Sequence, residues 1–193
     1  MTSDTNNTPN TSGIDFAAAK ANQDKKRYRL EYPITTEQGE TIHELWMRRP
    51  LLRDKQVAEW QSDDTSQYEM TTRMFASVLE QPISVVEELD EELDLMELLK
   101  VFKSFKDKPK IDGDTLTLKY PLTINGKIVE KLTLRRPKTK DSLNFKEEKL
   151  GEKIARLAGY RLEDLLDMDL QTDWLGLDAI YGSFRKRQPH PSR

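Results

Sequence analysis

The sequence predicts an α+β protein of two repeated modules, each a β-hairpin followed by about three helices. The first observation is a repeat: residues 32–50 run from Tyr-Pro through a glycine turn to Arg-Arg-Pro, and residues 120–137 do the same. The second is an apolar period of two within these segments, which is typical of half-buried strands. The third is apolar spacing of helical period after each Arg-Arg-Pro.

Each module is expected to begin with an antiparallel pair of strands. In the first copy the strands cover residues 28–32 and 42–49, and in the second they cover 116–120 and 128–136. Asn125-Gly126 suits a type I′ turn, because both central residues of that turn need positive φ. A proline ends each return strand, since proline has no N–H to donate to a sheet.

Amphipathic helices are expected after the hairpins. Residues 70–78 and 150–158 gather their apolar side chains on one helical face. The second of these segments is followed by Gly159, a residue that commonly closes a helix. Each copy therefore has at least one helix able to cover the apolar face of its hairpin.

Two shorter helices complete each module. One is expected at 85–89, where Ser84 can cap it, and its counterpart at 161–166. The last is expected at 94–102 and 173–181, each beginning at an aspartate whose carboxylate can accept from open backbone N–H groups. Each module would then end with an acidic, apolar-faced helix.

The repeat also divides the chain. A module of this size buries only about 60% of its unfolded surface, so the two copies are expected to pack on each other or on a partner. The expected segments are a disordered N-terminus (1–24), a first module (25–107), a linker (108–113), a second module (114–184) and a basic disordered tail (185–193).

Composition excludes several classes of protein. The chain has 193 residues, 36% of them hydrophobic and 34% charged, with a net charge of −3 and no cysteine. Disulfides, thiolate metal sites and a cysteine nucleophile are thus excluded. The N-terminus is not a signal peptide, and no apolar run is long enough for a membrane span. We therefore expect a soluble cytoplasmic protein without strong electrostatic attraction to nucleic acid.

No catalytic constellation is evident, and we predict neither an enzyme nor a cofactor. The two histidines, His43 and His190, lie in a hairpin and in the basic tail, and there is no glycine-rich phosphate loop. The spacing of Asp167, Asp169 and Asp173 resembles that of a calcium loop, but that loop's glycine is missing. Helix capping on a solvated face is the favoured interpretation of these aspartates, so no metal site is predicted.

The Arg-Arg-Pro ends are the strongest repeated polar feature. Adjacent strand residues point to opposite faces, so Arg48 and Arg135 point away from the apolar face of their strands. We expect one arginine of each pair to bind a helix carboxylate at the edge of the core. The alternative is an arginine offered to an acidic partner or to phosphate, which together with the basic tail is a weak nucleic-acid signal.

The element order resembles the small tail assembly chaperones of contractile-tailed bacteriophages. The features are a hairpin with a glycine turn, Leu-x-Leu-Arg-Arg-Pro, an Asp four residues on, then helices with Asp-x-x-x-Asp before a terminal Phe. The likeness covers residues 112–184 and 27–105, so the chain is similar to a tandem duplication of the family's unit. The doubling, the N-terminus and the basic tail depart from the family's pattern.

The resemblance implies a non-catalytic late protein of the host bacterial cytoplasm. Such chaperones coat the helical tape measure protein, keep it soluble, help the tail tube to polymerise and are absent from the mature virion. The tape measure protein is the implied partner, and the tail tube protein and a second copy of the chain are further candidates. The alternatives are a structural tail or baseplate component of the virion and a nucleic-acid-binding regulator.

Apolar surface in excess of one small core predicts where a partner binds. The candidates include two arginines as well as apolar residues. The predicted partner-binding residues are Trp46, Leu95, Met96, Leu99, Trp174, Leu177, Arg48 and Arg135.

Overall fold

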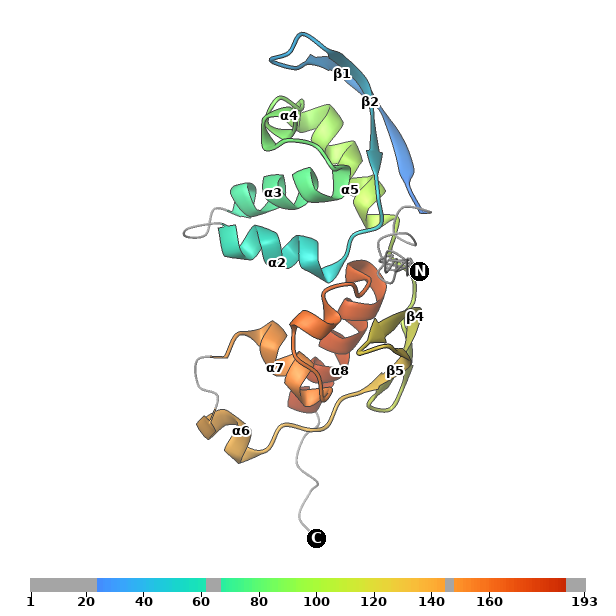
Figure 1. The fold of residues 1–193 in the computed structure, drawn as a ribbon, viewed down its shortest axis with the longest axis vertical. Coiled ribbons are helices and arrows are strands. Elements are labelled where there is room, and N and C mark those ends of the chain that lie inside the picture. Colours follow the sequence, from blue (N-terminus) through green and yellow to red (C-terminus); the bar gives the residue numbers. More distant parts are fainter. Residues whose placement is uncertain (1–23, 62–66, 145–147, 187–193) are drawn as a thin grey trace, which may run out of the picture.

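The computed structural model describes residues 24–61, 67–144 and 148–186, and it has the predicted α+β architecture of two hairpin-plus-helix modules (Figure 1). The expected disordered N-terminus lies outside the described residues, except for Asp24, and so do residues 187–193 of the expected tail. Arg185 and Lys186 are the last residues of a helix instead. Among the described residues, no helix is long and apolar enough to span a membrane.

The first module is a two-stranded sheet covered by helices on one side (Figure 1). Its elements are β1 (Lys26–Thr35), β2 (Thr41–Met47), α2 (Leu52–Gln61), α3 (Gln67–Leu79), α4 (Ile83–Glu87), the π-helical turn η1 (Glu91–Leu95) and α5 (Met96–Lys103). In the described residues five helical elements follow the hairpin, where about three helices were expected, and the last two of them, η1 and α5, are continuous.

The second module repeats this order around a three-stranded sheet. Its elements are β3 (Lys110–Asp112), β4 (Thr115–Ile124), β5 (Lys127–Thr133), α6 (Thr139–Asn144), α7 (Leu150–Leu157), the 3-10 turn η2 (Glu163–Leu165), the π-helical turn η3 (Leu170–Trp174) and α8 (Leu175–Lys186). Strand β3 lies in the segment interpreted as a linker. Gly113, at φ +59°, turns the chain so that β3 pairs with β4.

Both hairpins are interrupted at the same place. The ladder is regular from Lys26 to Arg29 and shifts before Ile34, and the equivalent shift lies between Thr117 and Leu122. A proline lies in each irregular stretch, where its missing N–H costs no ladder hydrogen bond. The predicted type I′ turn is confirmed, since Asn125 and Gly126 both have positive φ.

The irregular stretch frees strand N–H groups that a helix carboxylate then accepts. Asp94 accepts from Glu31 N at 2.9 Å and Asp173 accepts from Lys119 N at 2.9 Å, and both aspartates are fully buried. The N-caps of the final helical segments therefore lie four residues before the predicted aspartates. Asp90 and Asp169 are their N-caps, accepting from the backbone N–H three residues on.

A second capping prediction is wrong. Helix α4 begins after Pro82 without a side-chain cap, so Ser84 does not have the predicted role.

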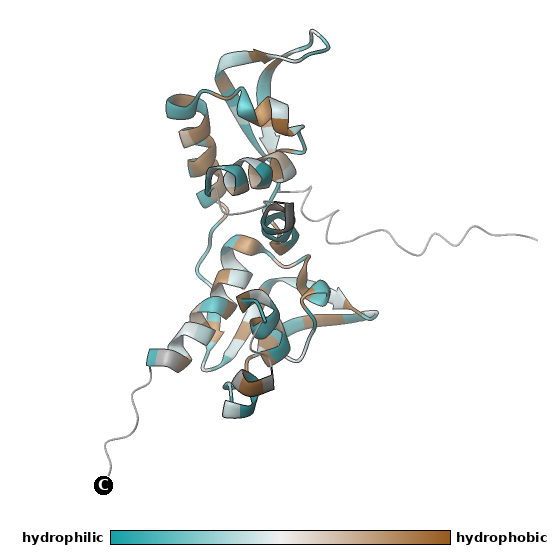
Figure 2. Cartoon of the chain, turned by 90° about the vertical axis from the view of Figure 1, so that its left-hand side faces the viewer, coloured by the Kyte–Doolittle hydropathy of each residue, from teal (hydrophilic) through white to brown (hydrophobic). Residues whose placement is uncertain are grey.

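The buried apolar residues of the two modules form one continuous cluster, which includes Met47 and Phe75 from the first and Leu116 and Leu177 from the second. In both modules the helices and strands carry hydrophobic residues interspersed with hydrophilic ones, as expected for elements with one buried face (Figure 2).

Candidate protein-binding site

Each Arg-Arg-Pro end is fixed by a two-pronged ion pair with the aspartate four residues after the proline. Arg48 Nη1 and Nη2 donate to the two carboxylate oxygens of Asp54 at 2.8 and 2.6 Å. Arg135 binds Asp141 in the same way at 2.8 and 2.7 Å. The prediction that one arginine of each pair binds a helix carboxylate is confirmed, so these guanidinium groups already have a strong anionic partner.

The carboxylate of Asp141 is held in its charged form. Hydrogen bonds from Arg135 and from the Lys138 backbone N–H keep the pKa of Asp141 well below its usual range. A carboxylate with a lowered pKa contributes stability above its unfolded pKa, and that contribution is lost as the pH falls through the folded value. The strand-to-helix connection is therefore expected to weaken only in strong acid.

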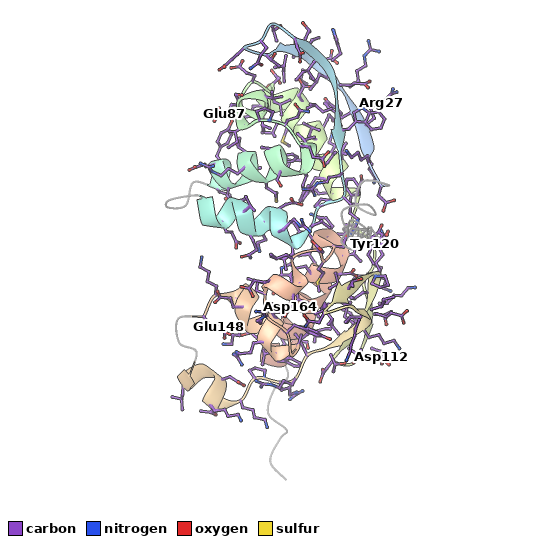
Figure 3. The ribbon with its side chains drawn as sticks, viewed as in Figure 1. Arg27, Glu87, Asp112, Tyr120, Glu148 and Asp164 are labelled. Atoms are coloured by element: carbon purple, nitrogen blue, oxygen red, sulfur yellow. The ribbon has the colours of Figure 1, made fainter. Side chains whose placement is uncertain are left out.

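The second arginine of the first copy has a different role, because it joins the two modules. Arg49 is 1% exposed, its guanidinium lies 3.7 Å from the ring centroid of Tyr120, and its Nη1 donates to Asp169 Oδ2 at 3.2 Å. Both partners belong to the second module. Figure 3 shows Tyr120 where the two modules meet. A buried cation with an aromatic face and a carboxylate ties the modules together.

Backbone hydrogen bonds extend this contact. Leu52 N donates to Met168 O at 2.9 Å, Arg53 N to Leu166 O at 2.9 Å, and Leu170 N to Pro50 O at 3.0 Å. Arg53 also forms an ion pair with Asp167. We call residues 49–53 the docking segment, and Tyr120 with residues 166–170 the docking face.

Asp167, Asp169 and Asp173, whose spacing resembles that of a calcium loop, each have a different partner at this junction. Asp167 pairs with Arg53, Asp169 with Arg49, and Asp173 with strand backbone. Burial raises the pKa of Asp173 to about 6, with the Asp169 charge adding to the effect. Within the described ranges, no cluster of three acidic or histidine side chains could hold a metal ion.

The predicted partner-binding residues fall into two groups. Trp46 and Met96 are 46% and 50% exposed, and Leu95 and Leu99 are half-buried beside Met96. Trp174 and Leu177 are buried, at 5% and 0% exposure. The exposed members come from strand β2 and from the η1–α5 segment of the first module, whereas Trp174 and Leu177 belong to η3 and α8 of the second.

A groove lies between α2, α7 and α8, where the two modules meet. It has a volume of about 370 Å³ and is lined by residues of both modules, including Trp174, Leu175 and Leu150. Leu150 and Leu175 are 51% and 39% exposed. Trp174 thus reaches the groove although it is mostly buried, and Lys55, Gln56 and Glu59 of α2 line the groove from the first module.

Sequence reasoning missed the two leucines, yet a signal for one of them was available. Counted from the N-caps Asp90 and Asp169, Met96 and Leu175 occupy the same position of the repeat. Both are exposed, whereas an apolar residue of a final helix facing the core would be buried at that position. An apolar side chain kept at the surface in both modules is the feature that most resembles a binding contact.

Comparison with known proteins places the chain in a family. A family model described as "Phage tail assembly chaperone proteins, E, or 41 or 14" matches residues 27–107 and 115–184. No curated protein and no solved structure matches the chain. The two matched segments cover most of the chain and coincide with the two repeats of hairpin and helices. The chain therefore belongs to the phage tail assembly chaperones and carries the family's unit as a tandem duplication.

Proposed function

We propose that this chaperone binds amphipathic helical segments of the phage tape measure protein, keeps that protein soluble, and releases it as the tail tube assembles. The membership of the family supports a role in tail assembly. A tape measure protein is long and amphipathic, so its apolar stripes need cover before the tube encloses them. In this proposal the protein acts without catalysis in the host bacterial cytoplasm and does not remain in the mature virion.

The observation that carries the proposal is the repeated exposure of Met96 and Leu175. Methionine and leucine at a helix surface can pack against the apolar stripe of another helix, and methionine adapts to partners of different shape. The groove beside Leu175 is large enough to take an apolar side chain of such a helix. Two related contacts on one chain would also raise the effective concentration of the second once the first is bound.

The test is co-expression of the chaperone with its tape measure protein, scoring the solubility and co-purification of that protein. The wild-type chaperone is expected to hold the tape measure protein in the soluble fraction. Met96→Glu and Leu175→Glu are expected to reduce co-purification severalfold, because each places a charge in an apolar contact. Ile128→Glu is the matched control, since Ile128 is 72% exposed on the β5 strand, far along the chain from both.

Two results would contradict the proposal. If the tape measure protein stays insoluble beside a folded chaperone, the proposed binding activity is absent. If purified virions contain the protein in stoichiometric amounts, a structural tail or baseplate role takes its place. Equal co-purification by the control and the two glutamate variants would show that the binding surface lies elsewhere.

A further inference from the structure

The junction between the modules is asymmetric. Each of its two contacting surfaces occurs twice in the repeat, and among the described residues only one copy of each is used. The junction uses the docking segment of the first module and the docking face of the second. By the repeat, the second module has its own docking segment, residues 136–140, and the first has its own docking face, Tyr32 with residues 87–91. Arg136, Lys138 and Lys140 are exposed, and Tyr32 is 58% exposed. Their counterparts Arg49 and Leu51 are buried.

Each open surface differs in charge from its counterpart at the junction, and the two differences have opposite sign. The docking segment Arg-Pro-Leu-Leu-Arg of the first copy is Arg-Pro-Lys-Thr-Lys in the second. The docking-face sequence Leu-Asp-Met-Asp-Leu of the second copy is Glu-Glu-Leu-Asp-Glu in the first. The free segment has gained positive charge, and the free face has gained negative charge. The two open surfaces are therefore complementary in charge.

At the repeat positions equivalent to each ion pair of the junction, the open surfaces again carry one basic and one acidic residue. Arg49 with Asp169 becomes Arg136 with Asp90, and Arg53 with Asp167 becomes Lys140 with Glu88. Tyr32 stands where Tyr120 lies under the Arg49 guanidinium. In this structure the Arg136 guanidinium lies 5.6 Å from the ring centroid of Phe184. On binding a second copy, Arg136 could leave this ring and stack on Tyr32 of that copy instead.

A pair of equivalent cavities supports the same mapping. In the second module, a cavity of about 410 Å³ between the β4–β5 turn and η2 is lined by Arg53 from the docking segment of the first module. In the first module, the equivalent cavity of about 360 Å³ between the hairpin turn and α4 is lined only by first-module residues. Glu37, Glu40 and Glu88 line it, so an entering lysine would meet carboxylates. Figure 3 places Glu87 on the same part of the first module, away from the second.

We propose that the open docking segment, residues 136–140, binds the open docking face, Tyr32 with residues 87–91, of a second copy of this chain. Because the two surfaces differ, the contact is heterologous, and repeated addition builds a head-to-tail row rather than a closed pair. The contact continues the arrangement of the internal junction but replaces its leucines by charges. It is consequently weaker than the internal junction and strongly salt-dependent. This inference stands independently of the proposed tape measure binding.

Sedimentation velocity of the full chain tests the proposal. At low salt the average mass is expected to rise with protein concentration, and in about 1 M salt it should return to the monomer value. Arg136→Glu with Lys140→Glu, or Glu88→Lys with Glu91→Lys, should each weaken association by at least about tenfold, since like charges then meet. Mixing these two variants should restore association. The reversed segment of one then meets the reversed face of the other, and the two unchanged surfaces also meet, so every contact again joins opposite charges.

Cross-linking then establishes the direction of the contact. The chain has no cysteine, so Lys140→Cys and Glu88→Cys each introduce a single thiol. A short bismaleimide is expected to join the two variants into a dimer only when they are mixed. Circular dichroism and thermal unfolding of every variant should match the wild type, since all of these positions are at the surface.

Either of two results would overturn the proposal. One is a monomer at every concentration in low salt, which would make the charged surfaces caps that end the array, as in repeat proteins. The other is cross-linking of a single variant with itself to the same extent as the mixture, which would show a contact of a different geometry.

Discussion

Buried carboxylates that bind backbone rather than a cation are the main feature at the residue scale. Asp94 and Asp173 are fully buried, and each accepts strand N–H groups freed where the hairpin ladder shifts. A carboxylate has enough lone pairs to serve two neighbouring donors, which a neutral side chain of this length does less well. The same residue type is therefore used twice at the same joint between sheet and helix.

The raised pKa of Asp173 predicts a dependence of stability on pH. Its pKa is 3.8 in the unfolded reference and about 6 in the folded protein, so between pH 4 and 6 the folded state holds a proton that the unfolded state has lost. The stability contributed by protonated Asp173 is then present below about pH 4 and is lost as the pH rises to about 6, a change of about 3 kcal/mol.

Urea denaturation of the wild type and Asp173→Asn from pH 4 to pH 7 measures this change. Other carboxylates titrate in both proteins and cancel, so the difference in the free energy of unfolding should move by about 3 kcal/mol in favour of the variant. Parallel curves across this range would show that Asp173 titrates normally.

Turns and ion pairs between consecutive elements determine the fold at the element scale. Asp54 accepts from both Nη atoms of Arg48, from Leu51 N and from Ser77 Oγ, and so joins β2, α2 and α3. Asp141 joins β5, α6 and α7 in the second module through Arg135, Lys138 N and Arg156. The two sites are alike in geometry, but the Arg48 side chain is 12% exposed and that of Arg135 is 44% exposed.

This difference predicts unequal effects of the same substitution. Asp54→Ala should lower the free energy of unfolding by about 3 kcal/mol, because it removes the two-pronged carboxylate partner of Arg48 and the acceptor of the Leu51 N–H in a mostly dry site. Arg48 keeps its longer contacts with Glu80 and with the Ser77 carbonyl. Asp141→Ala should cost less, since water can reach Arg135. Urea unfolding of both variants gives the comparison, and a larger loss for Asp141→Ala would contradict the argument from exposure.

The sequence predicted those parts of each element that depend on local residues. The Asn125-Gly126 turn followed from φ preferences. The sequence also predicted that one arginine of each Arg-Arg pair binds a helix carboxylate, but it did not say which one, and the structure shows that it is Arg48 in the first copy. The start of the final helices could not be predicted, because Asp94 is bound by donors more than 60 residues away. Strand β3 was missed because three residues beside a lysine-rich stretch carry too weak a period to identify.

The two modules differ at the scale of the whole molecule, although their sequences align. Arg49 and Arg136 occupy the same place in the repeat, yet one is buried at the junction and the other is exposed. The residues after them differ, Leu-Leu in the first copy and Lys-Thr in the second, but the surface that buries Arg49 belongs to the second module more than 60 residues away. The junction therefore could not be predicted from the repeat alone. The candidate groove was missed for the same reason, since its lining comes from α2, α7 and α8.

The burial of Arg49 predicts that this residue couples the unfolding of the modules. Arg49→Met leaves Asp169 charged and buried without its cation, so a loss of about 3–5 kcal/mol is expected. Arg136→Met, the matched change, should stay within about 0.5 kcal/mol because it lies at the surface.

Calorimetry distinguishes coupling from a local effect. The wild type and Arg136→Met should unfold in one transition with agreeing calorimetric and van't Hoff enthalpies, and Arg49→Met should separate into two. One undivided transition in Arg49→Met would show that the continuous apolar cluster, rather than the arginine, couples the modules.

The divergence of the two docking segments gives the order of the copies along the gene a physical meaning. If a rearrangement exchanged the copies, Leu51 and Leu52 would face water at a free end, and the buried boundary would have to form from lysines and glutamates. Such a protein would expose an apolar surface, which favours precipitation, while its two modules would contact each other only through solvated charged residues. Selection on solubility alone would then preserve the N-to-C polarity of this duplication.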